Sequence, residues 1–541
     1  MPARRLLILT LSAGLALAGG CARHDGAAAA GPGGRPAQVL RFGNGSEPQD
    51  LDPQAVTGVP ELNIIDSLFE GLVTGDPHDL HPVPGLAESW DISADGLVYT
   101  FHLRGGLRWS NGDPLTADDF VQSYKRILTP SLGSEYSYLL WFVAGAADYN
   151  AGRLSDFSKV GFEAVDDRTL RVSLRSPTPF LLKIIATHYS WDAVPVKVLA
   201  RYGPLDHKDT GWTKPGRLVG SGPFMLKEWT PNQRITVVRN PFYWDAANVR
   251  LDAIEYYPTD NGPTEERMFR TGQLDVTSTL PLPKTDVYRR DHPGELQIEP
   301  YLGLYFYRCN VTRPPLNDKR VRRALALAID RERLVKDVLR GDQMPAFAVS
   351  YPGDSGYTPE ARLSGGVPEA RRLLAEAGYP GGRGFPTIEL LYNTSDNHRL
   401  IAEAIQAMWR TNLGVDIRLT NEEWKVYLDA QHTQNFQMQR AGWIADYLDP
   451  HVFLEIWETR NGNNDTLWSN PEYDRVLHLA LNARSEAERY ADYQRLDAIL
   501  VDECPVIPIY YYTRVFAMNP RVAGWWPTLL DIHPWKYVYL R

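Results

Sequence analysis

The segment LVYTFHLRGGLRWSNGDPLTADDFVQSYKRIL, residues 97–128, contains a strand, a turn and a helix in one continuous run. Apolar and polar residues alternate over 97–103, which predicts a half-buried strand. The NGDP cluster that follows predicts a turn. Thr116 can cap a helix in which Asp118 and Asp119 favour the positive end of the helix dipole. This segment therefore predicts a fold that mixes strands and helices.

The same alternation of strand and helix continues along the chain. We expect amphipathic helices over 317–332, 367–380 and 401–414, and a strand over 387–393. Asn317 or Asp318 can cap the first of these helices. At 541 residues the chain is too long for one hydrophobic core. The sequence predicts an α/β protein of two or three domains.

Composition excludes some partners. The formal charge is −9, and it becomes −11 when Arg4 and Arg5 leave with the start of the chain. A net acidic protein without a basic run is a poor ligand for nucleic acid or for an anionic membrane surface. The 28 tyrosines and 15 tryptophans are compatible with a polar cleft lined by aromatic rings, although large cores use them too. We expect no nucleic acid among the partners.

The amino terminus predicts export. Residues 1–20 combine a basic start, a short apolar stretch and small residues, as a signal peptide does. Small residues directly before Cys21 resemble a bacterial lipoprotein box, although the usual leucine is displaced by one position. An ordinary secretory signal is the alternative. Residues 21–36 are rich in Ala and Gly and predict a flexible tether. We expect a periplasmic lipoprotein anchored to the membrane by lipid on Cys21.

Two cysteines remain after Cys21. Cys309 and Cys504 are not a CxxC pair, and no Cys/His cluster has metal-ligand spacing. Because exported proteins meet an oxidising environment, a disulfide between these two is possible. The sequence predicts no metal site.

Catalytic signatures are missing from the sequence. It contains no GxxxxGK[ST] phosphate loop, no HExxH zinc motif and no GxSxG nucleophile elbow. Carboxylate pairs such as Asp118–Asp119 are explained by helix capping. We expect no catalytic residues, no cofactor and no enzymatic activity, although a catalytic pair can be distant in sequence.

The stretch RAGWIADYLDP, residues 440–450, carries opposite charges on one predicted strand face. On a strand, Arg440, Gly442, Ile444 and Asp446 point the same way. Two unrelated surface charges or an intrachain salt bridge would explain the residues by themselves. A binding site for a ligand with charges of both signs is the other interpretation.

Several stretches together resemble the large periplasmic oligopeptide-binding proteins that supply ABC importers. The resemblance runs from about residue 40 to the carboxyl terminus. It rests on NGSEPQDLDP (44–53), GVPELNI (58–64), LFEGL (68–72), PGLAESW (84–90), WSNGDPLTADDF (109–120), LAEAGYP (374–380), LLYNTSDNH (390–398) and RAGWIADY (440–447). The fifth resembles the general signature of the family, whereas the last two resemble its oligopeptide branch.

The resemblance implies a two-lobed clamp with an additional inserted domain, three domains in all. Lobe one would comprise 37–69, 196–302 and 514–541. The inserted domain would span 70–195, and lobe two 303–513. The partners implied are an oligopeptide and the membrane permease of an ABC importer. We expect a monomer.

The resemblance also implies roles for individual residues. Asp446 would pair with the ammonium of the ligand, Arg440 with the carboxylate of short ligands, and His398 with that of longer ones. The main chain of the ligand would be bound by the backbone of Gly442, Trp443 and Ile444 and, across the cleft, of Thr57, Gly58 and Val59. The side-chain pockets would be lined by Tyr136, Trp424, Trp443 and Tyr512. Such a site holds what all peptides share, their charged ends and main chain.

Two positions depart from the family pattern. A cysteine pair of well-known members falls at Gly303 and Ile444, so that bridge is missing here. A lysine that aids carboxylate binding falls at Leu339, and Arg340 could replace it after a shift of one residue.

Three other functions compete with oligopeptide transport. A receptor for murein tripeptide or another modified peptide would share much of the framework. An exported peptidase would degrade its ligand instead of returning it intact. A surface lipoprotein with an interaction or chaperone role would bind peptides weakly and would not close on them.

Overall fold

The strand, turn and helix predicted for residues 97–128 are present. Strand β5 (Val98–Leu103) alternates between buried and half-buried residues, and α2 (Ala117–Leu128) follows the turn. The carboxylate of Asp119 accepts the backbone N–H of Thr116 at 2.8 Å and fixes the start of α2. Helix α2 packs on a four-stranded antiparallel sheet, whose order is β4 (Ala87–Ile92), β5, β7 (Thr169–Ser173) and β6 (Phe162–Asp166).

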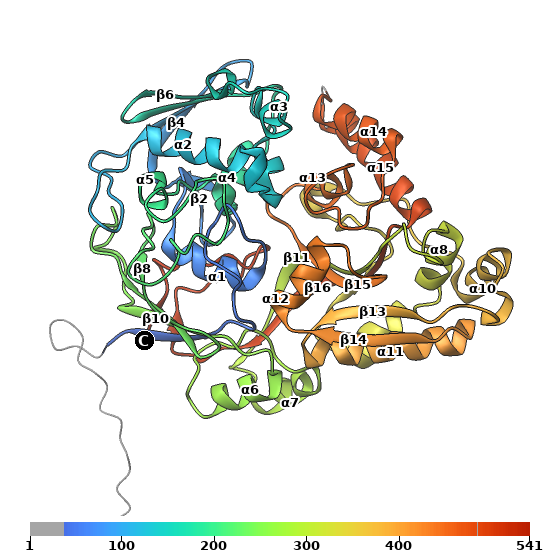
Figure 1. The fold of residues 1–541 in the computed structure, drawn as a ribbon. Helices are drawn as coiled ribbons and strands as arrows, with labels where there is room; N and C mark the ends of the chain where they lie inside the picture. Colours follow the sequence, from blue (N-terminus) through green and yellow to red (C-terminus); the bar gives the residue numbers. More distant parts are fainter. Residues whose placement is uncertain (1–36, 484) are drawn as a thin grey trace, which may run out of the picture. The chain divides into compact units, whose positions relative to one another are not determined.

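The computed structural model describes residues 37–483 and 485–541, and the structural statements below concern these residues. The signal peptide, Cys21 and the tether lie outside them. Residues 38–541 form one unit with three larger sheets (Figure 1).

A second sheet of four strands begins at the amino-terminal end of this unit. Its order is β1 (Val39–Gly43), β10 (Ala253–Tyr257), β9 (Arg234–Arg239) and β8 (Phe224–Thr230). Strands β1 and β10 are parallel, and the other pairs are antiparallel. Helix α1 (Val59–Leu68) packs on β8, with Gly58 at its amino-terminal cap.

The largest sheet has six strands. Their order is β12 (Met344–Pro345), β16 (Val506–Ala517), β11 (Leu296–Cys309), β15 (Met438–Ile444), β13 (Ile388–Asn393) and β14 (Ile417–Glu422). Helix α11 (Asp396–Leu413) packs on β13 and β14 (Figure 1). The prediction of strand and helix here was right, but the helix begins five residues earlier than 401 because Ser395 caps it.

The other two predicted helices are also confirmed. Helix α8 spans Lys319–Leu327, and the Asp318 side chain accepts the Arg320 N–H at 2.8 Å. Helix α10 spans Gly366–Glu376. The remaining helices are α3 (Ala146–Asn150), α4 (Leu181–Thr187), α5 (Val196–Leu199), α6 (Gly262–Arg270), α7 (Thr285–Asp291), α9 (Arg331–Arg333), α12 (Trp424–His432), α13 (His451–Leu454), α14 (Pro471–Leu481) and α15 (Glu486–Glu503).

Two long strands connect the sheets. Strands β11 and β16 pair antiparallel from Leu296 opposite Ala517 to Arg308 opposite Val506. Val276 forms bridges to β1 and to Met518, directly after β16. The two strands therefore lead from the sheet that contains β1 into the six-stranded sheet. Two short sheets complete the fold: β2 (Val73–Gly75) with β3 (Pro82–Pro84), and β17 (Val522–Ala523) with β18 (Tyr539–Leu540). None of the described helices is long and apolar enough to span a membrane.

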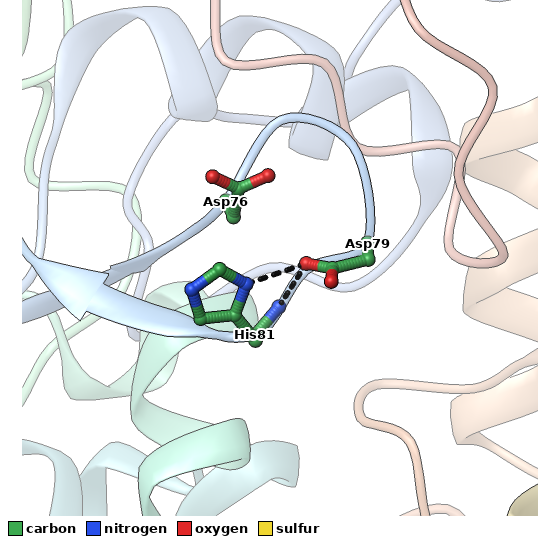
Figure 2. Close-up of side chains that lie close together, drawn as sticks. All are labelled: Asp76, Asp79 and His81. Carbon is green, nitrogen blue, oxygen red and sulfur yellow. Dashed lines mark hydrogen bonds and ion pairs between the residues drawn. The ribbon is translucent and has the colours of Figure 1, made fainter.

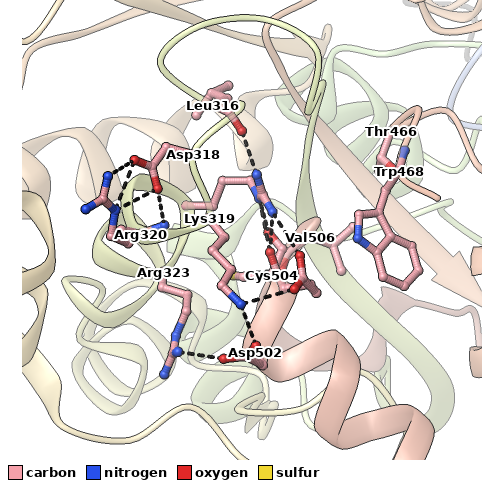
Figure 3. Close-up of polar contacts among 12 residues, drawn as sticks. Leu316, Asp318, Lys319, Arg320, Arg323, Thr466, Trp468, Asp502, Cys504 and Val506 are labelled. Atoms are coloured by element: carbon pink, nitrogen blue, oxygen red, sulfur yellow. Dashed lines mark hydrogen bonds and ion pairs between the residues drawn. The ribbon is translucent and has the colours of Figure 1, made fainter. Parts of the chain in front are cut away.

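The disulfide between Cys309 and Cys504, which the sequence left open, is not formed. Both thiols are buried and free, although the Cys309 N–H donates to the carbonyl of Pro505, one residue after Cys504. Cys504 ends α15 in the left-handed region, and its Sγ lies 3.3 Å from the carbonyl oxygen of Val506. Figure 3 shows Cys504 and Val506 at this turn beside Lys319 and Arg323, which both contact Asp502. The Cys504 thiol therefore bonds within its own turn.

Candidate functional site

Strand β15 carries the charged face that the sequence predicts. Arg440, Gly442 and Ile444 are half-buried, whereas the residues between them are buried. Asp446 lies two residues beyond the end of β15 and continues the same alternation. The two charges share one face of one strand, separated by six residues.

This face lines two connected cavities of about 930 Å³ and about 1630 Å³. Four of the predicted residues line only the smaller cavity: Thr57, Tyr136, Trp443 and Asp446. Two line only the larger cavity, His398 and Tyr512. Six line both cavities: Gly58, Val59, Trp424, Arg440, Gly442 and Ile444. Because six residues line both, the two cavities form one cleft, with Asp446 in its smaller part and His398 in its larger part.

Arg340 does not belong to this cleft. It has a left-handed backbone (φ 58°), and its guanidinium lies 3.2 Å from Asp286 among exposed residues. Leu339 lines the larger cavity in its place. The shift of one residue that the sequence suggested is therefore wrong: the turn after Leu339 directs the arginine outward.

One edge of β15 is free along the cleft. The strand pairs with β11 over its whole length, but with β13 only at Met438 and Gln439. The Ala445 N–H donates to Leu302 on the β11 side, so alternation turns the main-chain groups of Gly442 and Ile444 to the opposite, free edge. The backbone of Trp443 faces β11, contrary to the prediction, and only its side chain is available to the cleft.

Glycines allow the walls of the cleft to approach closely. A Cβ atom on Gly442 would lie 2.6 Å from the Tyr512 hydroxyl, and one on Gly58 would lie 2.9 Å from the Trp424 ring. Gly303 faces Ile444 across β11 and β15, where the cysteine pair of the resembled family would fall. A Cβ there would lie 2.5 Å from the Ile444 side chain, so the isoleucine fills this space.

Asp446 has a buried carboxyl group that no charged cation of the described residues contacts. Its side chain is 10 % exposed, and the Tyr138 hydroxyl lies 3.4 Å away. His188 Nε2 lies 3.5 Å from Asp446 Oδ1, but burial lowers the pKa of His188 to about 3, so the imidazole is neutral. Burial, and secondarily the charge of Glu455, raise the pKa of Asp446 well above its ordinary value. This end of the cleft therefore favours a cation.

Arg440 carries the positive charge of the cleft and is held by neutral groups. Its Nη2 donates to the Tyr512 hydroxyl at 2.6 Å and its Nη1 to Asn393 at 3.2 Å, while the guanidinium lies 4.7 Å from the centre of the Tyr305 ring. No carboxylate of the described residues forms an ion pair with it, and its buried Nε has no hydrogen-bond partner there. The guanidinium is positioned by neutral groups, and its charge is available to an anion.

His398 lies in the larger cavity beyond Arg440. Burial, with the charge of Arg440, lowers its pKa well below the ordinary value, so the ring is neutral. Its Nδ1 is buried and has no partner among residues 37–541 apart from 484. A neutral imidazole can offer one hydrogen bond to a ligand, not a charge.

Within the described part of the chain, the cleft thus offers a carboxyl group without a cation, a strand edge without a partner strand and a guanidinium without a carboxylate, in a row. Such an arrangement suits an extended ligand with an ammonium at one end, a carboxylate at the other and amide groups between them.

A family model agrees with this chemistry. Residues 81–465 match the model of bacterial extracellular solute-binding proteins, family 5. The periplasmic oligopeptide-binding protein OppA of Escherichia coli is 38 % identical over 501 residues, which cover 90 % of each chain. The chain belongs to this family.

Solved structures of family 5 proteins share the fold. The murein tripeptide-binding protein MppA of Escherichia coli superposes with a TM-score of 0.89 at 34 % identity, covering 94 % of this chain and 99 % of that one. OppA of Haemophilus influenzae in complex with RPPGFSPFR gives a TM-score of 0.88 at 32 % identity, with the same coverage. The clamp fold that the sequence resemblance implied is confirmed.

Sequence reasoning missed several neighbours of the two charges. Tyr138 and His188 enclose Asp446, while Asn393 and Tyr305 hold Arg440. Asn393 lies inside the quoted stretch LLYNTSDNH and could have been found there. The others carry no local signal, because only the fold brings them to the charges.

Two groups of side chains have the spacing of metal ligands. Asp76, Asp79 and His81 gather on the turn between β2 and β3, where His81 Nδ1 lies 2.6 Å from Asp79 Oδ1 (Figure 2). This group lines neither part of the cleft.

The second group is buried and consists of Glu299, Asp531 and His533. The Arg514 Nε donates to Asp531 Oδ2 at 2.6 Å, so a cation is already present beside these carboxylates. Both groups are explained by hydrogen bonds and ion pairs within the protein, and we assign a metal to neither.

Proposed function

We propose that this chain is an extracytoplasmic receptor that captures oligopeptides and delivers them to the permease of an ABC importer. Membership of a solute-binding family supports a transport role. The names of its relatives support peptides as the solute, since both OppA and MppA are named for peptide ligands.

One observation carries the proposal most strongly. Among the described residues, no charged cation pairs with the buried side chain of Asp446 and no carboxylate pairs with the half-buried Arg440, and the two lie on the same face of one chain segment. An uncompensated buried charge is costly, so proteins keep it where a ligand supplies the partner. A peptide supplies both partners at once. Six residues of strand span about 20 Å at most, which leaves room for a short peptide and its side chains.

Each group in the cleft then has a role. Asp446 binds the ammonium, Arg440 binds the carboxylate of short peptides, and His398 donates to the carboxylate of longer ones. The free edge at Gly442 and Ile444 bonds to the peptide main chain as an added strand does. Thr57, Gly58 and Val59 act from the opposite wall. Side chains of the peptide contact the rings of Tyr136, Trp424, Trp443 and Tyr512.

The clamp divides into three domains. Lobe one comprises 37–69, 196–302 and 514–541, the inserted domain 70–195, and lobe two 303–513. Strands β11 and β16 cross between the lobes, which supports hinge motion around them. The ligand is released intact, without catalysis.

The receptor acts in the periplasm as a monomer. Signal peptide 1–20 directs export, and lipid on Cys21 holds the protein at the membrane through the tether 21–36. These predictions rest on the sequence alone.

A receptor for murein tripeptide is the second candidate. The high similarity to MppA favours it. The larger cavity beyond Arg440 favours unmodified peptides of several lengths instead, because a receptor restricted to tripeptides would not need that space.

Mass spectrometry of ligand retained through purification tests the proposal. We expect a mixture of linear peptides of different sequence. After unfolding and refolding without ligand, added tripeptide should bind and be recovered intact. A single modified peptide would favour the second candidate, and cleaved peptide would contradict a pure transport role.

A further inference from the structure

A third cavity lies beside the Asp446 end of the cleft. It measures about 610 Å³ and shares Thr187, His188, Tyr189 and Ile532 with the cavity that Asp446 lines. The two cavities therefore adjoin at these four residues, next to the position of the ammonium that Asp446 would bind.

The lining of this cavity has an excess of negative charge. Three carboxylates, Asp66, Glu70 and Asp192, line it together with one lysine. Lys536 Nζ lies 3.8 Å from Glu70 Oε1, and the two form the ion pair of the cavity. Asp66 and Asp192 are left without a cation among the described residues.

Asp192 is the clearest sign of a missing partner. The residue is 8 % exposed and lines the cavity, and its carboxyl group makes no hydrogen bond or ion pair with any described residue. A Cβ on Gly71 would lie 2.7 Å from Asp192 Oδ1 and within 3.4 Å of the carbonyl oxygens of Val73 and Ile185. Hydrogen-bond acceptors therefore gather at this point, and a donor from outside would satisfy them.

Asp66 stands where a helix disfavours an acidic residue. It lies in the last turn of α1, at the negative end of the helix dipole. The last turn of α4, with Ile185 and Thr187, lines the same cavity. Burial raises the pKa of Asp66 to about 7, a cost that a bound cation would remove. Two helix carboxyl ends and two carboxyl groups without a cationic partner among the described residues therefore favour a bound cation at this place.

We propose that this cavity is a second cation site, which takes the ammonium or guanidinium of a lysine or arginine side chain near the amino terminus of the bound peptide. The inference rests on the proposed function, because the ammonium at Asp446 sets the position of the peptide. It makes the protein selective for peptides with a basic residue at the first or second position.

Calorimetry with paired peptides tests this selectivity. Each tripeptide contains two alanines and either lysine or N6-acetyl-lysine at the first, second or third position. The affinity of each peptide is measured with purified protein that has been freed of ligand. Acetylation keeps the length of the side chain and removes its charge. We expect lysine to bind about tenfold more tightly than acetyl-lysine at the first or second position, but not at the third.

Variants assign the preference to the cavity. Asp192→Asn and Asp66→Asn should each reduce the ratio between lysine and acetyl-lysine peptides to about threefold or less. The exposed Asp118 on α2 provides the matched control, since Asp118→Asn removes the same charge elsewhere and should keep the ratio of the unchanged protein. Thermal unfolding curves verify that each variant is folded.

The outcomes separate the two proposals. Equal affinity for lysine and acetyl-lysine at all positions, with trialanine bound, overturns the cation site and leaves the receptor function standing. A preference that survives in both variants also overturns it. Failure of every peptide to bind overturns the receptor function and, with it, the inference.

Discussion

The two ends of the cleft hold opposite charges in opposite ways. Asp446 lies in the smaller cavity, 10 % exposed, close to Tyr138 and a neutral His188. The guanidinium of Arg440 donates hydrogen bonds to the Tyr512 hydroxyl and to Asn393, and the larger cavity extends beyond it. The anionic end is enclosed, whereas the cationic end is open on its far side.

This difference suggests how peptides of several lengths can share one site. An enclosed anion gives every peptide the same starting point for its ammonium. A cation with space beyond it can bind the carboxylate of a short peptide or let a longer chain pass. Because the surroundings of Asp446 and Arg440 differ, we expect removal of each charge to change peptide affinity by a different amount.

Loss of the enclosed anion should have the largest effect. Asp446→Asn leaves a buried ammonium without its carboxylate, and breaking a buried ion pair costs about 3–5 kcal/mol. Since about 1.4 kcal/mol corresponds to a tenfold change, tripeptide affinity should fall by roughly two orders of magnitude or more. Isothermal titration calorimetry of the ligand-free variant measures this affinity. Asp118→Asn is the control, because it removes the same charge at an exposed position. A loss below tenfold would remove Asp446 from the proposed role.

Loss of the open cation should have a smaller, length-dependent effect. Arg440→Gln keeps hydrogen-bond donors but removes the charge. We expect tripeptide affinity to fall about tenfold and pentapeptide affinity less, because the longer carboxylate lies beyond Arg440. The exposed Arg410 of α11 offers a matched control, Arg410→Gln. Equal losses for both lengths would mean that Arg440 does not bind the carboxylate of short peptides.

The pH dependence of affinity should be weaker still. Burial raises the pKa of Asp446 above its ordinary value in the free protein, and a bound ammonium favours the ionised form. Binding therefore lowers the pKa of Asp446 and releases protons, so tripeptide affinity should rise with pH through the raised pKa of the free carboxyl, by less than tenfold in total. His188 adds nothing, because its pKa of about 3 keeps it neutral throughout. Calorimetric titration in buffers of different ionisation enthalpy measures the number of protons released on binding. If affinity depends on pH equally in the Asp446→Asn variant, Asp446 is not the group that releases them.

The sequence predicted those features that depend on neighbouring residues. Alternation placed Arg440, Gly442 and Ile444 on one face of β15, and the predicted caps Thr116 and Asp318 located the starts of two helices. These depend on the period of a strand or on one turn of chain, so local chemistry is sufficient.

Features that depend on the path of the whole chain could not be predicted in this way. Asp66 and Asp192 lie far apart in sequence and line one cavity. The left-handed backbone of Arg340 turns a cation away from the cleft, although Leu339 beside it faces inward. Cys504 lies near Cys309 in the fold, but its turn directs the thiol to Val506.

Titration of the unmodified protein with four forms of one tripeptide tests the central claim most directly. The forms are the free peptide, its N-acetyl derivative, its carboxyl amide and the doubly blocked peptide. If Asp446 and Arg440 bind the two termini, acetylation should weaken binding by roughly two orders of magnitude, amidation by about one, and both together by more than either. Equal affinity for the free and the acetylated peptide would contradict the account.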